Sequence, residues 1–111
     1  MGFLDTHAAR HFSAQKLAKT NLFETPQMFA DIYGLEPGQA QKLHVHAGAS
    51  KFYFVIEGHG VFRLGDQERE LGPGELAWSA PGEPHGVENR SDARLVLLVA
   101  MSPNPNTPAP D

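Results

Sequence analysis

Short apolar or alternating segments recur along the chain, and turn-forming residues separate them. The clearest segments are residues 43–46, 52–56, 60–64, 68–71, 75–78, 86–89 and 94–101. Glycine- and proline-containing stretches such as Gly72-Pro73-Gly74 lie between them. Many short strands with turn signals at this spacing predict an all-β sandwich or barrel. None of these segments carries a pattern that favours a helix instead.

The two ends of the chain carry weaker patterns. Residues 13–23 mix polar and apolar side chains, which favours one or two edge strands, and residues 27–35 are richer in strand-forming residues. Residues 1–12 show no strong period, and residues 102–111 include four prolines and no side chain suited to a core. The pattern therefore predicts an N-terminal arm (1–12), one β-domain (13–101) and a solvated proline-rich tail (102–111).

Composition limits the classes of protein to which the chain can belong. With 111 residues, 41% of them hydrophobic, the chain has enough apolar side chains for one core and not for two. It contains no cysteine. Disulfides, thiolate metal sites and a cysteine nucleophile are therefore excluded, and a cytoplasmic location is the default expectation.

Charge and hydropathy argue against two kinds of partner. The formal net charge is −4, and the nine Lys and Arg residues are scattered without a cluster, which is atypical of a nucleic-acid-binding surface. The longest apolar run, residues 95–101, is far shorter than the ~20 residues of a membrane span. We therefore expect a small-molecule ligand, with neither nucleic acid nor a membrane as partner.

Three histidines are the candidates for chemistry. His44 and His46 are separated by one residue, and on a strand such side chains project from the same face, where two imidazoles can bind one metal ion. His85 follows a Pro-Gly turn further along the chain. Taken alone, a pair such as His44 and His46 more often belongs to an ordinary strand surface. Because cysteine is absent, a metal ion here must use nitrogen or oxygen ligands.

The spacing of glycines and histidines resembles the two motifs of the cupin superfamily. The matching residues are Gly38, His44, His46 and Gly58 in the first motif, and Gly74, Gly82, His85 and Asn89 in the second. The resemblance is to small single-domain cupins of the conserved-barrel (cupin 2) type. It implies a small antiparallel jelly-roll β-barrel, which agrees with the strand pattern.

Two positions depart from these motifs. Ala80 stands at the proline position of the second motif, with Pro81 one residue later, and Lys51 stands at the glutamate position of the first. In metal-binding cupins that glutamate and three histidines hold one divalent ion. The resemblance therefore implies His44, His46 and His85 as ligands of Zn, Fe, Mn or Ni, without the fourth ligand.

A charged Lys51 opposes a metal ion at this place. An ammonium about 5 Å from a dication, at an effective dielectric of ~20, costs roughly 6–7 kcal/mol, a large part of a metal-binding free energy. Three outcomes stay open: the lysine is deprotonated, its flexible stem carries the charge to the barrel mouth, or no metal binds.

The sequence leaves two function classes open. One is a metal-dependent enzyme, such as an oxygenase or isomerase, in which the three-histidine ion keeps open positions for substrate. The other is a non-catalytic cupin that binds or senses a small polar molecule, metal-free where Lys51 excludes the ion. In either class we expect Lys51 and Trp78 to line the pocket. The family resemblance and the edge-strand segment 13–35 also predict a homodimer.

Overall fold

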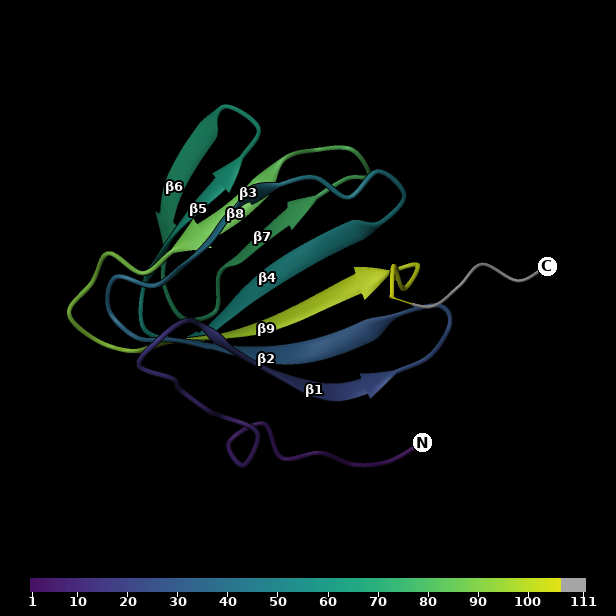
Figure 1. The fold of residues 1–111 in the computed structure, drawn as a ribbon, viewed down its shortest axis with the longest axis horizontal. Coiled ribbons are helices and arrows are strands. Elements are labelled where there is room, and N and C mark those ends of the chain that lie inside the picture. The colour runs from purple at the N-terminus through teal and green to yellow at the C-terminus, as the bar shows by residue number, and fades with distance from the viewer. Residues whose placement is uncertain (107–111) are drawn as a thin grey trace.

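A computed structural model describes residues 1–106, and within this range nine strands and no helix make up the fold (Figure 1). The strands are β1 (Ala18–Glu24), β2 (Phe29–Leu35), β3 (Ala40–His44), β4 (Ser50–Glu57), β5 (Gly60–Leu64), β6 (Gln67–Leu71), β7 (Leu76–Ser79), β8 (His85–Glu88) and β9 (Leu95–Ser102). The all-β prediction is confirmed. No helix of the described part is long and apolar enough to cross a membrane.

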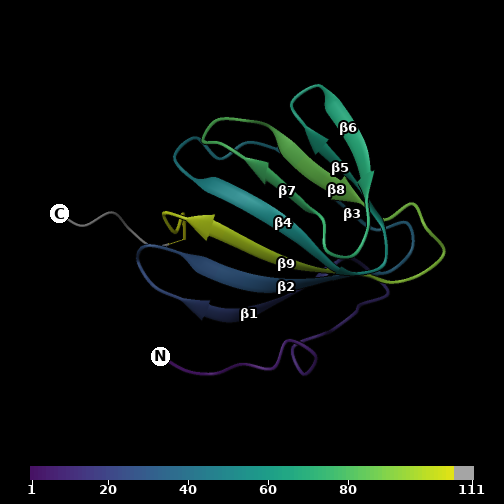
Figure 2. The same cartoon turned by 180° about the vertical axis from the view of Figure 1, so that it is seen from behind.

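The strands form two antiparallel sheets. One sheet has the order β1-β2-β9-β4-β7 and the other the order β3-β8-β5-β6. Figures 1 and 2 show, from opposite sides, the two sheets spreading apart from one end of the molecule. This arrangement is the small antiparallel jelly roll that the sequence predicts. The aromatic run of β4 lies inside the larger sheet, between β9 and β7.

Several strand ends differ from the predicted ones. β3 covers Ala40–His44 rather than residues 43–46, so His46 lies beyond the strand. In the segment 13–35, β1 and β2 form the strands, and residues 13–17 precede them. β9 continues to Ser102, one residue past the predicted end of the domain. The division into arm, domain and tail stays a prediction.

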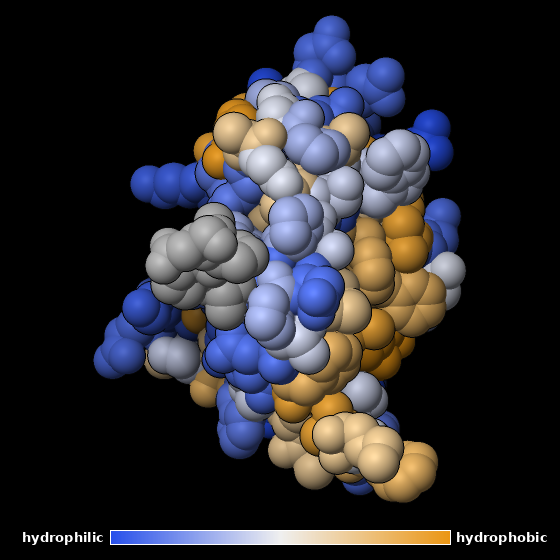
Figure 3. Space-filling model, turned by 90° about the vertical axis from the view of Figure 1, so that its right-hand side faces the viewer, coloured by the Kyte–Doolittle hydropathy of each residue, from blue (hydrophilic) through white to orange (hydrophobic). Residues whose placement is uncertain are grey.

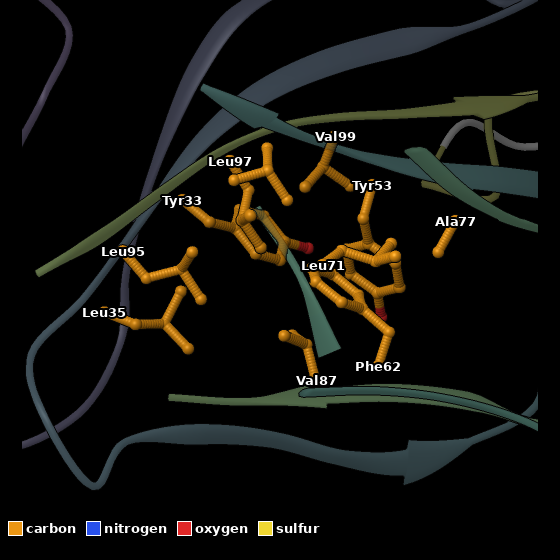
Figure 4. Close-up of a cluster of buried hydrophobic side chains, with 11 residues drawn as sticks. Tyr33, Leu35, Tyr53, Phe62, Leu71, Ala77, Val87, Leu95, Leu97 and Val99 are labelled. Carbon is orange, nitrogen blue, oxygen red and sulfur yellow. The ribbon is translucent and has the colours of Figure 1, made fainter. Parts of the chain in front are cut away.

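The core lies between the sheets and follows the alternation of side chains along each strand. On β4, Lys51, Tyr53 and Val55 are buried and point inward, whereas the residues between them are only partly covered. Figure 4 shows the main apolar cluster that results. Its members are Tyr33, Leu35, Tyr53, Val55, Phe62, Leu71, Ala77, Val87, Leu95, Leu97 and Val99.

Asn89, a residue of the second motif, has a structural role at the end of β8. Its side chain is fully buried, and its Nδ2 donates hydrogen bonds to the carbonyl oxygens of Leu35, at 3.0 Å, and Ala93, at 2.8 Å. These bonds join the β8–β9 loop to the end of β2, and they satisfy the buried amide of Asn89. The motif asparagine therefore closes the barrel rather than contributing to a binding site.

We predict that shortening a buried side chain on the central strand β9 destabilises the fold much more than shortening an exposed side chain on the edge strand β7. Leu97 on β9 has no exposed surface, whereas Leu76 on β7 is 47% exposed. Leu97→Ala should lower the free energy of unfolding by about 2–5 kcal/mol, because it leaves a cavity in the core. Leu76→Ala, the matched control, should cost less than about 1 kcal/mol. Urea denaturation of both variants measures the difference, and equal losses would contradict the assigned core.

Candidate functional site

The three predicted histidines meet at one end of the barrel. His44 is the last residue of β3 and His85 the first of β8, and the two are paired directly across these antiparallel strands. His46 joins them from the loop that follows β3. One nitrogen from each imidazole lies within 4.8 Å of the other two. The structure thus brings together the three residues that the motifs indicate.

His46 reaches the site from a loop and not from the strand face that the sequence predicts. β3 ends at His44, and its pairing with β8 shifts register between Gln41 and His44, so simple alternation does not extend to His46. The loop is held instead by the turn before β8, where the backbone N–H of Gly82 donates to the carbonyl oxygen of His46 at 2.9 Å. This bond fixes where the third imidazole lies.

Backbone carbonyls orient two of the imidazoles. Nδ1 of His44 lies 2.7 Å from the carbonyl oxygen of Lys42, and Nδ1 of His85 lies 3.0 Å from that of Glu83 and 3.1 Å from Oγ of Ser79. A carbonyl oxygen only accepts, so we assign the proton to Nδ1 in both rings. Each Nε2 then carries a lone pair, the arrangement found in metal-binding histidines.

The buried Nε2 of His85 provides the test of whether a metal ion fits. This nitrogen is shielded from solvent and has no hydrogen-bond partner in the described part of the chain. A buried polar atom without a partner costs free energy, and a metal ion would satisfy it. In tetrahedral coordination, nitrogens at about 2.1 Å from one ion lie about 3.4 Å apart, so the three rings, now within 4.8 Å of one another, would have to shift inward. The donor set fits a divalent ion.

Burial keeps these imidazoles neutral, as metal ligation requires. It lowers the pKa of His85 to about 4, although the hydrogen bond to Glu83 acts in the opposite direction. Burial also lowers the pKa values of His44 and His46, and the charge of Lys51 adds to the effect at all three rings. Neutral imidazoles are the form that binds metal ions.

Lys51 points into the same site, as the motif position predicts. Its side chain is 3% exposed, and its Nζ lies 2.9 Å from Oε1 of Gln41 and 3.4 Å from Nε2 of His44. The stem therefore does not carry the charge to the barrel mouth, which removes one of the three outcomes left open by the sequence. The amine stands beside the lone pair that a metal ion would use.

A polar network that the sequence did not identify holds Lys51 in place. Oε1 of Gln41 also accepts a hydrogen bond from the Tyr53 hydroxyl at 2.6 Å, and the Gln41 amide donates to the Tyr33 hydroxyl at 3.3 Å. Nζ of Lys51 lies 4.7 Å from the ring centre of Tyr53 and 5.7 Å from that of Tyr33. These aromatic faces stabilise the ammonium. For Tyr53, the signal in the sequence was its place two residues after Lys51 on the same strand.

The surroundings of Lys51 shift its proton equilibrium strongly. Burial lowers the pKa of Lys51 to about 7, and the positive charge of Lys19 contributes in the same direction. The carboxylate of Asp31 partly opposes this shift, while burial raises the pKa of Asp31 itself. The ammonium is therefore held at a free-energy cost that its hydrogen bonds only partly offset.

A cavity of about 420 Å³ opens from the site. It is lined by Lys19, Phe29, Asp31, Tyr33, Gln41, Lys42, His44, His46, Lys51, Met101, Pro105 and Asn106. Its volume suits a small molecule. Three lysines and one carboxylate line it, so its charge is net positive when the lysines are protonated.

The first residues of the predicted tail form part of this cavity wall. Nδ2 of Asn104 donates to the carbonyl oxygen of Thr25, at 3.0 Å, and to the carboxylate of Glu24, at 3.2 Å, and this side chain is buried. Pro105 and Asn106 then line the cavity. Asn104 therefore packs against the barrel, whereas Pro103, Pro105 and Asn106 are exposed, and the solvated tail stays a prediction. Residues 107–111 of that tail lie outside the described residues.

Trp78 does not join the pocket, and that prediction is wrong. On β7, Ala77 and Ser79 are buried, and Ser79 contacts His85, so alternation turns Trp78 to the outer face of the sheet. There it is 63% exposed. It lines a separate apolar groove with Phe52 and Ala100. A shift of one residue along a strand separates a pocket position from a surface position.

We predict that removing the Lys51 charge stabilises the fold in a pH-dependent way. The pKa of Lys51 is lowered from 10.5 to about 7, so the unfolded chain binds the proton more readily between these values. The resulting loss of stability is complete below pH 7 and disappears as the pH rises toward 10.5. Lys51→Met should therefore raise the free energy of unfolding by about 1–4 kcal/mol at neutral pH.

Urea denaturation across this pH range measures the effect. The stabilisation of Lys51→Met should shrink steadily above pH 7. Lys16→Met removes an exposed lysine that does not line the cavity and serves as the matched control, with little change expected. A stabilisation of Lys51→Met that stays constant up to pH 10.5 would contradict the assigned burial of the ammonium.

Three relatives show what the chain is similar to. The crystal structure of TT1209 from Thermus thermophilus superposes with a TM-score of 0.91 at 42% identity and covers 95% of this chain and 100% of its own. The oxalate-binding protein of Thermotoga maritima is 28% identical over 79% of this chain and 72% of its own length. A cupin-superfamily sugar phosphate isomerase from Silicibacter pomeroyi has a TM-score of 0.71 at 28% identity, over 78% of this chain and 59% of its own.

A family model agrees with the fold and with the two motifs. Residues 31–101, which make up more than half of the chain, match the model of the cupin domain, Cupin_2. The matched range begins on β2, ends on β9, and contains the three histidines and Lys51. The chain therefore belongs to the cupin family.

Proposed function

We propose that this cupin binds a small polar molecule at a divalent metal ion held by His44, His46 and His85. The observation that carries the proposal is the buried Nε2 of His85, which has no partner in the described structure and faces two further imidazoles. The cavity of about 420 Å³ beside the histidines supplies room for the ligand. The oxalate-binding relative supports a small polar ligand. The lack of cysteine supports a reducing, cytoplasmic setting.

A bound ion would act as a Lewis acid toward an oxygen atom of the ligand, because three protein ligands leave coordination positions open. The residues of the chain then position the ligand. Lys51 donates hydrogen bonds from one side, and Gln41, which also accepts from the Tyr53 hydroxyl, holds Lys51. The Asp31 carboxylate faces the same cavity. If the site is catalytic, this arrangement suits an oxygenase or isomerase, whose substrate binds at the open positions.

The position of Lys51 supports a second candidate function, that of a metal-free binding or sensing cupin. Its Nζ already lies 3.4 Å from Nε2 of His44, so the amine shares the lone pair that a metal ion would use. A protonated Lys51 would then hold an anionic ligand directly, without an ion. The two candidates differ in what occupies the lone pairs of the three histidines.

We predict that tag-free protein binds one divalent ion per chain and that His46 is required for it. Calorimetric titration of Zn²⁺, Fe²⁺, Mn²⁺ or Ni²⁺ should show this binding in the wild type and its loss in His46→Ala. His59→Ala removes an exposed histidine outside the site and should bind as the wild type does. Lys51→Glu should tighten binding roughly 100-fold or more, because it replaces a repelling charge by a ligand.

One result would decide against the metal-bound form, and another against the opposing role of Lys51. If no ion binds after reconstitution, and a ligand instead requires Lys51, the metal-free candidate stands. If Lys51→Glu binds metal no more tightly than the wild type, the amine does not oppose an ion at the three histidines.

We also propose that the chain forms a homodimer through the outer face of its larger sheet. Leu76 and Trp78 are 47% and 63% exposed on β7, and Phe52 of β4 lines an apolar groove with Trp78. Figure 3 shows apolar residues gathered on one flank of the surface. Apolar area of this kind is typical of an interaction site. A second copy is the occupant consistent with the family resemblance and the symmetry preference of oligomers.

We predict a particle of twice the 12.1 kDa chain mass in light scattering at micromolar concentration. Trp78→Glu places a charge in the proposed interface and should shift the particle to the monomer mass. Arg69→Glu, on the other sheet, also adds negative charge and should leave the dimer unchanged. A wild type that scatters as a monomer, or a Trp78→Glu dimer of unchanged stability, would exclude this interface.

A further inference from the structure

We infer that the ligand of this site is a small carboxylate, and that Lys51 makes the carboxylate and the metal ion bind cooperatively. The inference rests on the proposed metal site and adds the charge class of its ligand. It starts from the residue at the glutamate position of the motif. At that position this chain places a cation among the three histidines.

The described chain supplies no negative charge at the histidine cluster. The ligand atoms that lie within 4.8 Å of one another there belong to His44, His46 and His85, and none of these residues is Asp or Glu. The carboxylate of the cavity, Asp31, accepts a hydrogen bond from the Asn21 amide at 2.9 Å. A dication there and the buried ammonium together carry three positive charges, and the Asp31 carboxylate, which lies outside the histidine cluster, offsets only part of them. The rest of the countercharge has to come from the ligand.

Metal binding also removes one hydrogen-bond acceptor from Lys51. Nζ now donates to Oε1 of Gln41 and to Nε2 of His44. A metal ion at Nε2 of His44 takes that lone pair, so the ammonium loses this acceptor while a positive charge arrives beside it. An ammonium has three N–H donors, and two are then without an acceptor. A carboxylate oxygen restores an acceptor and neutralises charge in one step.

A neutral ligand supplies the hydrogen-bond acceptor but not the countercharge. A hydroxyl or amide oxygen accepts a hydrogen bond from Lys51 but leaves the summed charge of ion and ammonium unchanged. Lys19 and Lys42 line the same cavity and add to its positive potential. Carboxylates are therefore favoured over amides of the same shape, and the preference grows when the metal ion is bound.

Cooperative binding has a reciprocal signature. If a carboxylate tightens metal binding by some factor, the metal ion must tighten carboxylate binding by the same factor. A carboxylate that touches the ion alone also produces such coupling. The contribution of Lys51 is the part of the coupling that disappears when its charge is removed.

Calorimetric titration of Zn²⁺ in saturating acetate or acetamide tests this. In the wild type, acetate should tighten Zn²⁺ binding roughly 5–150-fold over acetamide, and Zn²⁺ should tighten acetate binding equally. In Lys51→Met, Zn²⁺ alone should bind at least about 10-fold more tightly than in the wild type, because the repulsion is gone, and the acetate effect should shrink several-fold. Gln41 keeps the Tyr53 hydroxyl as a partner in this variant.

Two further variants complete the test. Lys51→Gln removes the charge but keeps a polar group, and its binding data stand in if Lys51→Met does not fold. Lys16→Met makes the same charge change at an exposed lysine that does not line the cavity and should keep the wild-type acetate effect. An acetate effect in either Lys51 variant equal to that of the wild type would overturn the inference. So would equal effects of acetate and acetamide in the wild type.

The inference and the proposed function fail in different ways. If Zn²⁺ binding is absent from the wild type and from Lys51→Met, or survives in His46→Ala, the metal site itself is wrong. If Zn²⁺ binds and is lost in His46→Ala, yet acetate acts equally with and without the Lys51 charge, the metal site stands and the role of Lys51 in selecting a carboxylate is refuted.

Discussion

Burial of the Lys51 ammonium against three imidazoles is the interaction on which the arrangement of the site depends. A buried ammonium is costly unless acceptors and aromatic faces surround it, and Gln41, His44, Tyr33 and Tyr53 supply them. Both tyrosines are also members of the apolar cluster between the sheets. The residues that form the core therefore also position the charge, and the polar site is a continuation of the core rather than a loop added to it.

The two sheets contribute different parts to this site. The smaller sheet supplies His44 and His85 from the paired strands β3 and β8, while the larger sheet supplies Lys51 from β4 and Ser79 from β7. Ser79, opposite Lys51 in the β4–β7 pair, reaches across to Nδ1 of His85 at 3.1 Å. The distance between the charge and the imidazoles is thus set by how the sheets pack, which side-chain rotation alone does not change. Such preorganisation is what a binding site needs.

The sequence was sufficient for the features that depend on local pattern or on motif spacing. Alternation and turn residues predicted the all-β fold, and the two motifs brought His44, His46 and His85 together. Alternation failed where backbone geometry intervened. The irregular register of β3 brings Gln41 to Lys51, and the early end of that strand leaves His46 on a loop. Trp78 was expected in the pocket, but it lies one residue along β7 from the inward-facing Ser79 and so faces outward. The packing of Asn104 against the β1–β2 turn depends on contacts about 80 residues apart in sequence, which no local pattern reveals.

The same geometry explains why a lysine at the glutamate position changes the ligand more than the fold. Lys51 and Tyr53 follow the alternation that any inward-facing residues of β4 would follow, so the substitution leaves the barrel intact. What changes is the sign of the charge beside the three imidazoles. A glutamate there would neutralise part of an ion's charge and allow a neutral ligand, whereas a lysine adds to that charge and transfers the requirement for an anion to the molecule that binds. In this cupin the selection of a ligand by charge therefore follows from one residue of β4 whose place is already fixed by the core.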